Sequence, residues 1–168
     1  MKPLDHARTM ARYNRWMNRR LYECGAKLTD AQRKEDRRAF FKSIHGTLNH
    51  LLLADNIWMG RFEGKPFAAT SLAQELHADF AELRHGREAM DERILDWAGA
   101  LTEETLAGEL RYTSIVNPAP RRLPMSLAVV HFFNHQTHHR GQVTTLLFQA
   151  GIDPGITDLM WMAQEESK

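Results

Sequence analysis

The apolar side chains near the start of the chain recur every three or four positions. Within residues 4–28 they are Met10, Tyr13, Met17, Leu21 and Cys24. This spacing follows the 3.6-residue period of an α-helix and gathers the apolar groups on one face. The pattern predicts a first amphipathic helix, after which the charged residues 32–38 form a solvated surface segment.

Residues 40–62 form a second helical pattern that is apolar around most of its circumference. A stripe containing Phe41, Ile44 and Leu48 is widened by Leu52 and its neighbours. A helix of this kind lies at the centre of a core. His50 stands in the same run, so burial would require its ring nitrogens to find partners.

Two more helices are predicted, over residues 71–101 and 125–150. Ser71 has the side chain of a helix N-cap, with Gln74 three residues later. Gly151 directly follows the last helix and suits the residue after a helix C-cap. Between these helices the pattern changes.

Residues 106–124 are short of helical periodicity and rich in proline. They predict two short strands around a proline turn, or an irregular crossover. A long connection at this place allows the last helix to run in a direction that short loops forbid. We therefore expect an all-α protein: a four-helix bundle with a long crossover before its fourth helix, in a single domain spanning residues 1–168.

Composition narrows the function classes. The 22 Lys and Arg side chains nearly balance 21 Asp and Glu, a formal charge of +1, which argues against a nucleic-acid partner. No apolar run approaches the ~20 residues that span a bilayer, and no export signal is visible, so we expect no membrane partner. Cys24 is alone, which excludes an internal disulfide and favours a buried thiol in a reducing, cytoplasmic setting.

Nine histidines are the most informative feature, and four of them stand at positions 131, 135, 138 and 139 of one predicted helix. Residues four apart on a helix lie one above the other, so His131 with His135, or His135 with His139, could bind one metal ion. His135 with His138, three apart, satisfies a looser form of the same spacing. The spacing alone does not choose between these pairs. A further ligand must come from another helix, where His50 is the best candidate and His45 the second, with His6 and His77 more distant. The alternative is that these rings only form hydrogen bonds in the core.

Several segments resemble the DinB family of metal-binding four-helix bundles. They are RYNRWMN at residues 12–18, GTLNHLLLAD at 46–55 with Trp58 shortly after, NHQTHHRGQ at 134–142 and AGIDPG at 150–155. Each motif is weak alone, but their order and separation together are specific. The resemblance covers nearly the whole chain.

The resemblance implies that His50, His135 and His139 are the metal ligands, with His131 and His138 as neighbours. It also implies an up-down-down-up bundle, a homodimer, and zinc or nickel as the ion. Three histidines leave a coordination position open.

Three functions are compatible with an open site. The first is transfer of a small thiol to an electrophilic small molecule, as in a related branch of the superfamily. The second is a non-catalytic metal-dependent binding or stress-response module. The third is metal-assisted hydrolysis with Asp55 as the base, although no H-E-x-x-H motif is present. The sequence does not identify catalytic residues or a substrate.

Polar residues near these motifs have two possible roles. Asn14, Trp16, Asn18 and Asn134 could orient the histidines, or they could form hydrogen bonds between helices. Arg140 is expected to be a solvated surface arginine, with an acidic partner or a substrate anion as the alternative. Trp58 is expected in the core. Apolar residues 159–162, with parts of the first helix, offer a surface that a dimer could bury.

Overall fold

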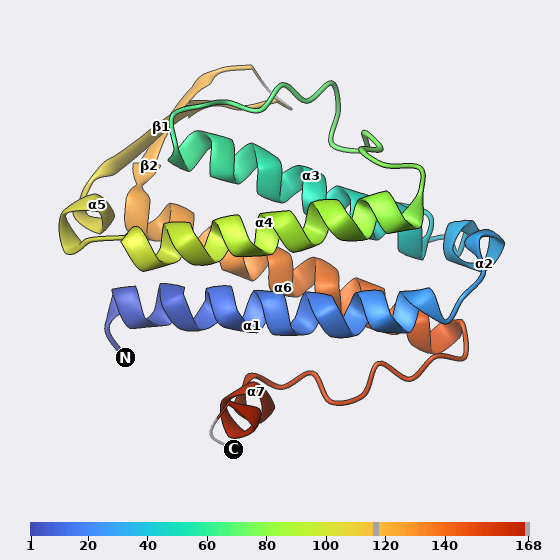
Figure 1. The fold of residues 1–168 in the computed structure, drawn as a ribbon. Coiled ribbons are helices and arrows are strands. Elements are labelled where there is room, and N and C mark those ends of the chain that lie inside the picture. The colour runs from blue at the N-terminus through green and yellow to red at the C-terminus, as the bar shows by residue number, and fades with distance from the viewer. Residues whose placement is uncertain (116–117, 167–168) are drawn as a thin grey trace.

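The computed structural model describes residues 1–115 and 118–166. Its four long helices lie side by side: α1 (Pro3–Ala26), α3 (Ile44–Phe62), α4 (Phe80–Ala100) and α6 (Met125–Gln149). Helices α1 and α6 run in one direction, while α3 and α4 run in the opposite one (Figure 1). The all-α bundle with up-down-down-up order expected from the sequence is therefore confirmed.

Five short elements complete the described chain: α2 (Asp30–Lys34), α5 (Glu103–Ala107), β1 (Glu109–Thr113), β2 (Pro120–Pro124) and α7 (Leu159–Glu165). The strands β1 and β2 form an antiparallel hairpin, which confirms the two short strands predicted before the last long helix. The turn predicted between them includes residues 116–117, which lie outside the described residues. The hairpin lies beside the C-terminal end of α3 (Figure 1).

Helix α3 begins four residues later than the sequence pattern indicates. The hydroxyl of Ser43 accepts a hydrogen bond from the backbone N–H of Gly46 at 3.0 Å and caps the helix. Arg38 and Lys42 before it have positive φ angles of 59° and 65°, which form a turn that a helix cannot include. Phe41 consequently lies in a loop that folds back on α3.

Helix α4 begins at Phe80, so the prediction of a helix capped by Ser71 is wrong. Asp79 is the cap instead, and its carboxylate accepts a hydrogen bond from the backbone N–H of Glu82 at 2.9 Å. Residues 63–79 form an irregular segment that returns along the bundle over α3 (Figure 1). Because α3 and α4 run in the same direction, the segment that connects them must extend along the length of the bundle.

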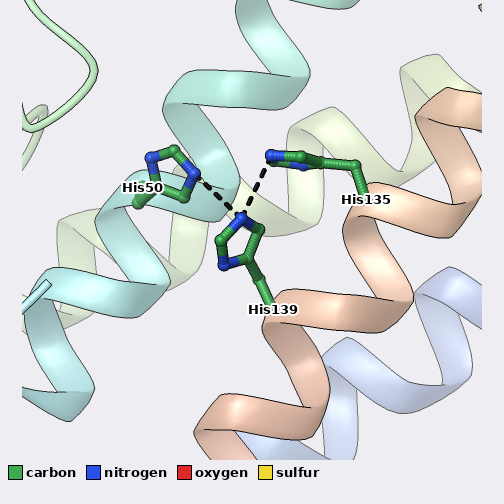
Figure 2. A group of neighbouring side chains, drawn as sticks. All are labelled: His50, His135 and His139. Carbon is green, nitrogen blue, oxygen red and sulfur yellow. Dashed lines mark hydrogen bonds between the residues drawn. The ribbon is translucent and has the colours of Figure 1, made fainter. Parts of the chain in front are cut away.

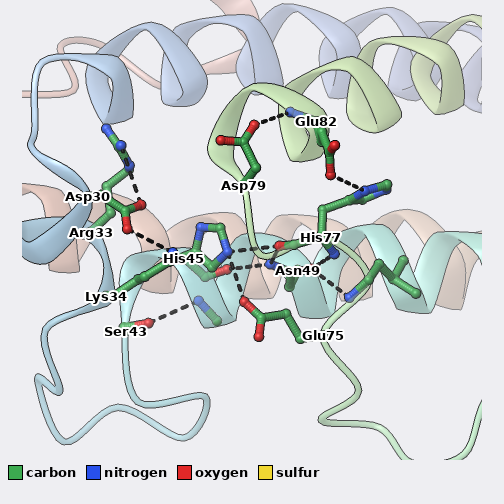
Figure 3. A network of polar contacts seen from close by, with 12 residues as sticks. Asp30, Arg33, Lys34, Ser43, His45, Asn49, Glu75, His77, Asp79 and Glu82 are labelled. Carbon is green, nitrogen blue, oxygen red and sulfur yellow. Dashed lines mark hydrogen bonds and ion pairs between the residues drawn. The ribbon is translucent and has the colours of Figure 1, made fainter.

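The final part of this connection is fastened to α3 by a buried asparagine. The side-chain oxygen of Asn49 accepts hydrogen bonds from the backbone N–H groups of Leu76, at 2.8 Å, and His77, at 3.1 Å. Its amide nitrogen donates to the backbone oxygen of His77 at 3.0 Å. His45 Nε2 lies 2.9 Å from the same oxygen and 3.1 Å from the carboxylate of Glu75 (Figure 3). These bonds hold residues 72–77, which we call the strap, against α3.

We expect Asn49→Ala to lower the free energy of unfolding by about 1–3 kcal/mol, because it leaves buried backbone groups of the strap without partners. Chemical denaturation of the metal-free protein measures this change. Asn56→Ala is the matched control, since Asn56 donates to the backbone of its own helix only, at Leu52, and should cost about 0.5 kcal/mol or less. Equal effects of the two substitutions would show that the strap is not anchored by Asn49.

The core lies between the four long helices. Its fully buried side chains include Leu21 of α1, Leu48 of α3, Ile94 of α4, and Phe132 and Leu147 of α6. Cys24 is also buried, as the sequence pattern predicted. In the described parts of the chain, no helix combines the length and apolar character that crossing a bilayer requires.

Candidate metal centre

Three histidine rings converge where α3 faces α6 (Figure 2). His50 comes from the middle of α3, while His135 and His139 come from successive turns of α6. The Nε2 atom of His139 lies 3.2 Å from Nε2 of His50 and 3.1 Å from Nε2 of His135. One ring nitrogen from each residue lies within 4.8 Å of the other two. The three histidines that the family resemblance implied are thus brought together.

The hydrogen bonds of Nδ1 in His50 and His139 determine the tautomer of each ring. His50 Nδ1 lies 2.9 Å from the backbone oxygen of Leu72, in the strap, and His139 Nδ1 lies 2.8 Å from the side-chain oxygen of Gln142. Because both oxygens can only accept, both Nδ1 atoms carry the proton. The two Nε2 atoms therefore face each other with lone pairs at 3.2 Å. Two lone pairs repel at this distance, whereas a cation between them would bind both.

Two of the three nitrogen–nitrogen separations match those between ligands of a transition metal. Metal–nitrogen bonds of about 2.0–2.1 Å at angles of 90–110° place two nitrogens about 2.9–3.4 Å apart. The His50–His139 and His135–His139 separations of 3.2 and 3.1 Å lie in that range. The residues present therefore fit a group that could hold a divalent metal ion.

All three rings are kept neutral by their surroundings. Burial, with a smaller contribution from His139, lowers the pKa of His50 to about 4. Burial, followed by the neighbouring histidines His139 and His50, lowers the pKa of His135 to about 3. Burial also lowers the pKa of His139. Because a metal competes with protons for the same lone pairs, these shifts leave the nitrogens available at neutral pH.

A phenyl ring covers the imidazole of His50. Phe41 stacks on His50 with ring centroids 3.7 Å apart and an angle of 14° between the planes. Gly46 stands one turn before His50 on α3, and a Cβ there would collide with the backbone oxygen of Phe41. Glycine at this position thus allows the loop to lie directly against the helix and to fix the orientation of the imidazole.

The other histidines lie outside this group of three. His138 is exposed; its Nε2 accepts from the amide of Gln142 at 3.2 Å, and its ring makes an edge contact with that of His139 at 4.9 Å between centroids. His131 is also exposed, with its ring centroid 5.9 Å from that of His135. His45 and His77 belong to the strap contacts, and His6 is half-buried on α1. Across residues 1–115 and 118–166, no fourth His, Cys, Asp or Glu joins the cluster.

The asparagines near α1 serve the packing of helices. Asn14 and Asn18 donate to the carboxylate of Asp91 on α4 at 3.0 and 2.8 Å. Trp16 donates from its ring nitrogen to Glu165 of α7 at 2.8 Å, and Asn134 is exposed. For the three residues of α1, these hydrogen bonds support the alternative role between helices and not the orientation of the histidines.

Asp55 takes part in a buried ion network instead of facing the histidines as a base. Its carboxylate lies 2.6 Å from Nη1 of Arg87, and its second oxygen accepts from the amide of Gln136 at 3.0 Å. Arg87 Nη2 also lies 3.0 Å from Asp91. These charged side chains are 1–2% exposed. With Arg87 and Gln136 bound to it, Asp55 is not placed to activate a water molecule at the site.

Arg140 is buried as well, so the expectation of a solvated surface arginine is wrong. It is 2% exposed and donates to the side-chain oxygen of Asn14 and to Thr137. Burial lowers its pKa to about 10. Because His139 and Arg140 are consecutive, the same turn of α6 presents one side chain to the histidine cluster and the other to α1.

A cavity of about 240 Å³ opens beside the cluster. His50 and His135 form part of its wall, and Trp58, Arg61 and Tyr112 form another part. Trp58 is 9% exposed, as its predicted core position requires, but its ring also faces this space. A small molecule could therefore reach the side of the cluster that the protein leaves open.

Three supports of the cluster were not predicted from the sequence: Leu72, Gln142 and Phe41. Gln142 stands three positions after His139, a helical spacing that would have identified it. The backbone oxygen of Leu72 and the ring of Phe41 come from irregular segments, where periodicity carries no signal.

The fold and the cluster together define a class: a four-helix bundle in which one histidine from the second long helix and two from the fourth form a group that could hold a metal ion. Comparison with known families gives the same result. The profile of the DinB family matches residues 3–168, so the chain belongs to the DinB family. The chain is also similar to the protein DinB of Bacillus subtilis (strain 168), with 28% identity over 162 residues that cover 92% of this chain and 91% of that protein.

Proposed function

We propose that the chain binds one divalent transition metal, zinc or nickel, through the Nε2 atoms of His50, His135 and His139. The observation that carries this proposal is the pair of lone pairs facing each other on His50 and His139, with both Nδ1 protons engaged elsewhere. Imidazole nitrogens suit both zinc and nickel. Gln142 and the strap would then orient the ligands, a role that commonly accompanies metal-binding histidines.

We further propose that this is an open site with a chemical role. Three protein ligands are typical of catalytic zinc sites, whereas structural sites have four. The cavity of about 240 Å³ on the His50 and His135 side supports access by a small molecule. When bound, the metal would supply the positive charge that lowers the pKa of a thiol or water in the remaining position.

The reaction that we favour is transfer of a small thiol to an electrophilic molecule. The thiol would release its proton to solvent, its sulfur would form a bond to an electrophilic carbon, and the leaving group would depart with the electrons of the bond that breaks. The protein would position the thiol and exclude competing water. The hydrolytic alternative required Asp55 as the base. The ion pair of Asp55 with Arg87 argues against that role, because the carboxylate is already engaged.

Titration of the cobalt-substituted protein with 2-mercaptoethanol tests the proposal. We expect the visible d–d bands to shift and to saturate at one thiol per cobalt, because a thiolate would enter the open position. Mass spectrometry with 1-chloro-2,4-dinitrobenzene should then detect the S-conjugate, formed faster than without protein. A spectrum that does not respond to thiol would contradict the transferase and favour a purely binding role for the ion.

We also propose that the protein is a homodimer. Exposed apolar side chains on α6 and α7 support it: Leu127, Val130, Phe148, Met160 and Trp161 are 44–71% exposed. Such surfaces are commonly buried between two copies of a chain. Sedimentation equilibrium should give the mass of two chains, and a single-chain mass at every concentration would contradict this proposal.

A further inference from the structure

Arg61 faces the cavity that His50 and His135 also line. It stands in the last turn of α3, and its guanidinium carbon lies 4.6 Å from the ring centre of Trp58 and 4.2 Å from that of Tyr112 on β1. These two cation–π contacts hold the group in place. Two of the three clustered histidines and a fixed positive charge thus line the same cavity.

This positive charge has no carboxylate partner in the described residues, 1–115 and 118–166. Two arginines of the neighbouring helix α4 differ: Arg87 pairs with Asp55, and Arg93 pairs with Glu63 at 2.6 Å. Burial lowers the pKa of Arg61, and only Tyr112 opposes this effect. A partly buried guanidinium without a counter-ion is costly, so the cavity has an electrostatic preference for an anion.

The size of the cavity limits the ligand that can connect the two features. Its volume is about 240 Å³, which suits a small molecule. Arg61 and Tyr112 also belong to a neighbouring cavity of about 470 Å³, so Arg61 lies at the boundary between the two. A molecule that contacts both Arg61 and the histidines through the smaller cavity is therefore a small one.

We propose that Arg61 binds the carboxylate of a short mercaptocarboxylic acid whose thiol occupies the open position at His50, His135 and His139. This inference rests on the proposed function and specifies its thiol substrate. A guanidinium can donate two parallel hydrogen bonds to a carboxylate, which gives both affinity and orientation. Trp58 and Tyr112 position Arg61, so the carboxylate fixes one end of the ligand while its sulfur reaches the cluster.

Paired titrations of the cobalt-substituted protein test the inference. The probes are 3-mercaptopropionate, which carries a carboxylate, and 2-mercaptoethanol, which is neutral and of similar size. A charge-assisted hydrogen bond contributes about 1.5–3 kcal/mol, so the wild-type protein should bind the first probe about ten- to hundredfold more tightly. Arg61→Gln should abolish that preference and leave the affinity for 2-mercaptoethanol within about twofold. Comparing the ratio between variants removes any difference in the intrinsic acidity of the thiols.

Two further variants complete the design. Arg61→Lys keeps the charge but loses the paired hydrogen bonds, so it should retain only part of the preference. Arg111→Gln is the matched control, because Arg111 lines only the larger cavity and is paired with Glu109 at 2.8 Å, and it should retain the full preference. Cobalt content and circular dichroism of each variant establish that it is folded and loaded.

The outcomes separate the two proposals. If both thiols bind the wild-type protein equally, or if Arg61→Gln and Arg61→Lys keep the full preference for 3-mercaptopropionate, the role of Arg61 is overturned while thiol binding at the metal stands. If neither thiol changes the cobalt spectrum, the proposed function fails and this inference fails with it.

Discussion

Replacing His139 with alanine is expected to lower the affinity for zinc by more than about a hundredfold. Its Nε2 atom lies 3.2 Å from that of His50 and 3.1 Å from that of His135. The substitution therefore removes the nitrogen that is close to both of the others, and only two proposed metal ligands remain. Loss of a residue that merely orients a ligand already costs 10–100-fold in metal affinity, and loss of the ligand itself should cost more. Equilibrium dialysis against buffered zinc measures the change.

His138→Ala is the matched control for this substitution. His138 is adjacent on the same helix but exposed, and it does not belong to the group of three, which it contacts through Gln142 and the edge of its ring. It should retain zinc within about tenfold. Circular dichroism should show the same helix content in both variants, because the core is formed by apolar side chains of all four long helices. Wild-type zinc affinity in His139→Ala would refute its assignment as a ligand.

The largest loss of stability is expected from Arg87→Met. Arg87 is 2% exposed and pairs with Asp55 at 2.6 Å and Asp91 at 3.0 Å. Methionine preserves much of the volume but leaves two carboxylates buried without their cation. Removing one partner of a buried ion pair costs about 3–5 kcal/mol, and chemical denaturation at pH 7 should show a loss of that size.

The pH dependence of this loss provides a second test. Burial already raises the pKa of Asp91 above its ordinary 3.8 in the wild-type protein, and loss of Arg87 should raise it further. A carboxyl whose folded-state pKa is raised destabilises the fold above its unfolded pKa, and the effect disappears as it becomes protonated in both states. The deficit of Arg87→Met should therefore shrink as the pH falls toward 4.

Arg84→Met on the same helix is the comparison for this variant. Arg84 pairs with Glu88 at 2.9 Å, but both side chains are exposed. Exposed ion pairs contribute about 1 kcal/mol or less, so the two substitutions should differ severalfold. If Arg87→Met costs no more than Arg84→Met, the buried network does not contribute to stability as its geometry indicates.

The long helices could be predicted because their information is local. Periodic apolar positions define α1, and an apolar run followed by Gly151, with a φ of 80°, defines the end of α6. The start of α4 could not be predicted from Ser71, because the backbone groups of Leu76 and His77 are bound to Asn49, far away in the sequence. Local propensity would permit a helix in this segment, but tertiary contacts with α3 keep the strap in an irregular conformation.

The histidine cluster was only partly accessible to sequence reasoning. Spacing left three pairs on the last helix open and offered His50 as the best further ligand. The family resemblance was needed to choose His135 with His139. The buried charges were missed for a physical reason. Arg87 and Arg140 have the side chains of surface residues, and only the folded chain brings them to Asp55, Asp91 and Asn14.

Anomalous diffraction from crystals grown with zinc, recorded on both sides of the zinc absorption edge, tests the central claim most directly. The account predicts a single strong peak within about 2.0–2.2 Å of Nε2 of His50, His135 and His139, with density for a further ligand on the cavity side. A peak bound by only one or two of these histidines, or no peak between them at saturating zinc, would contradict it.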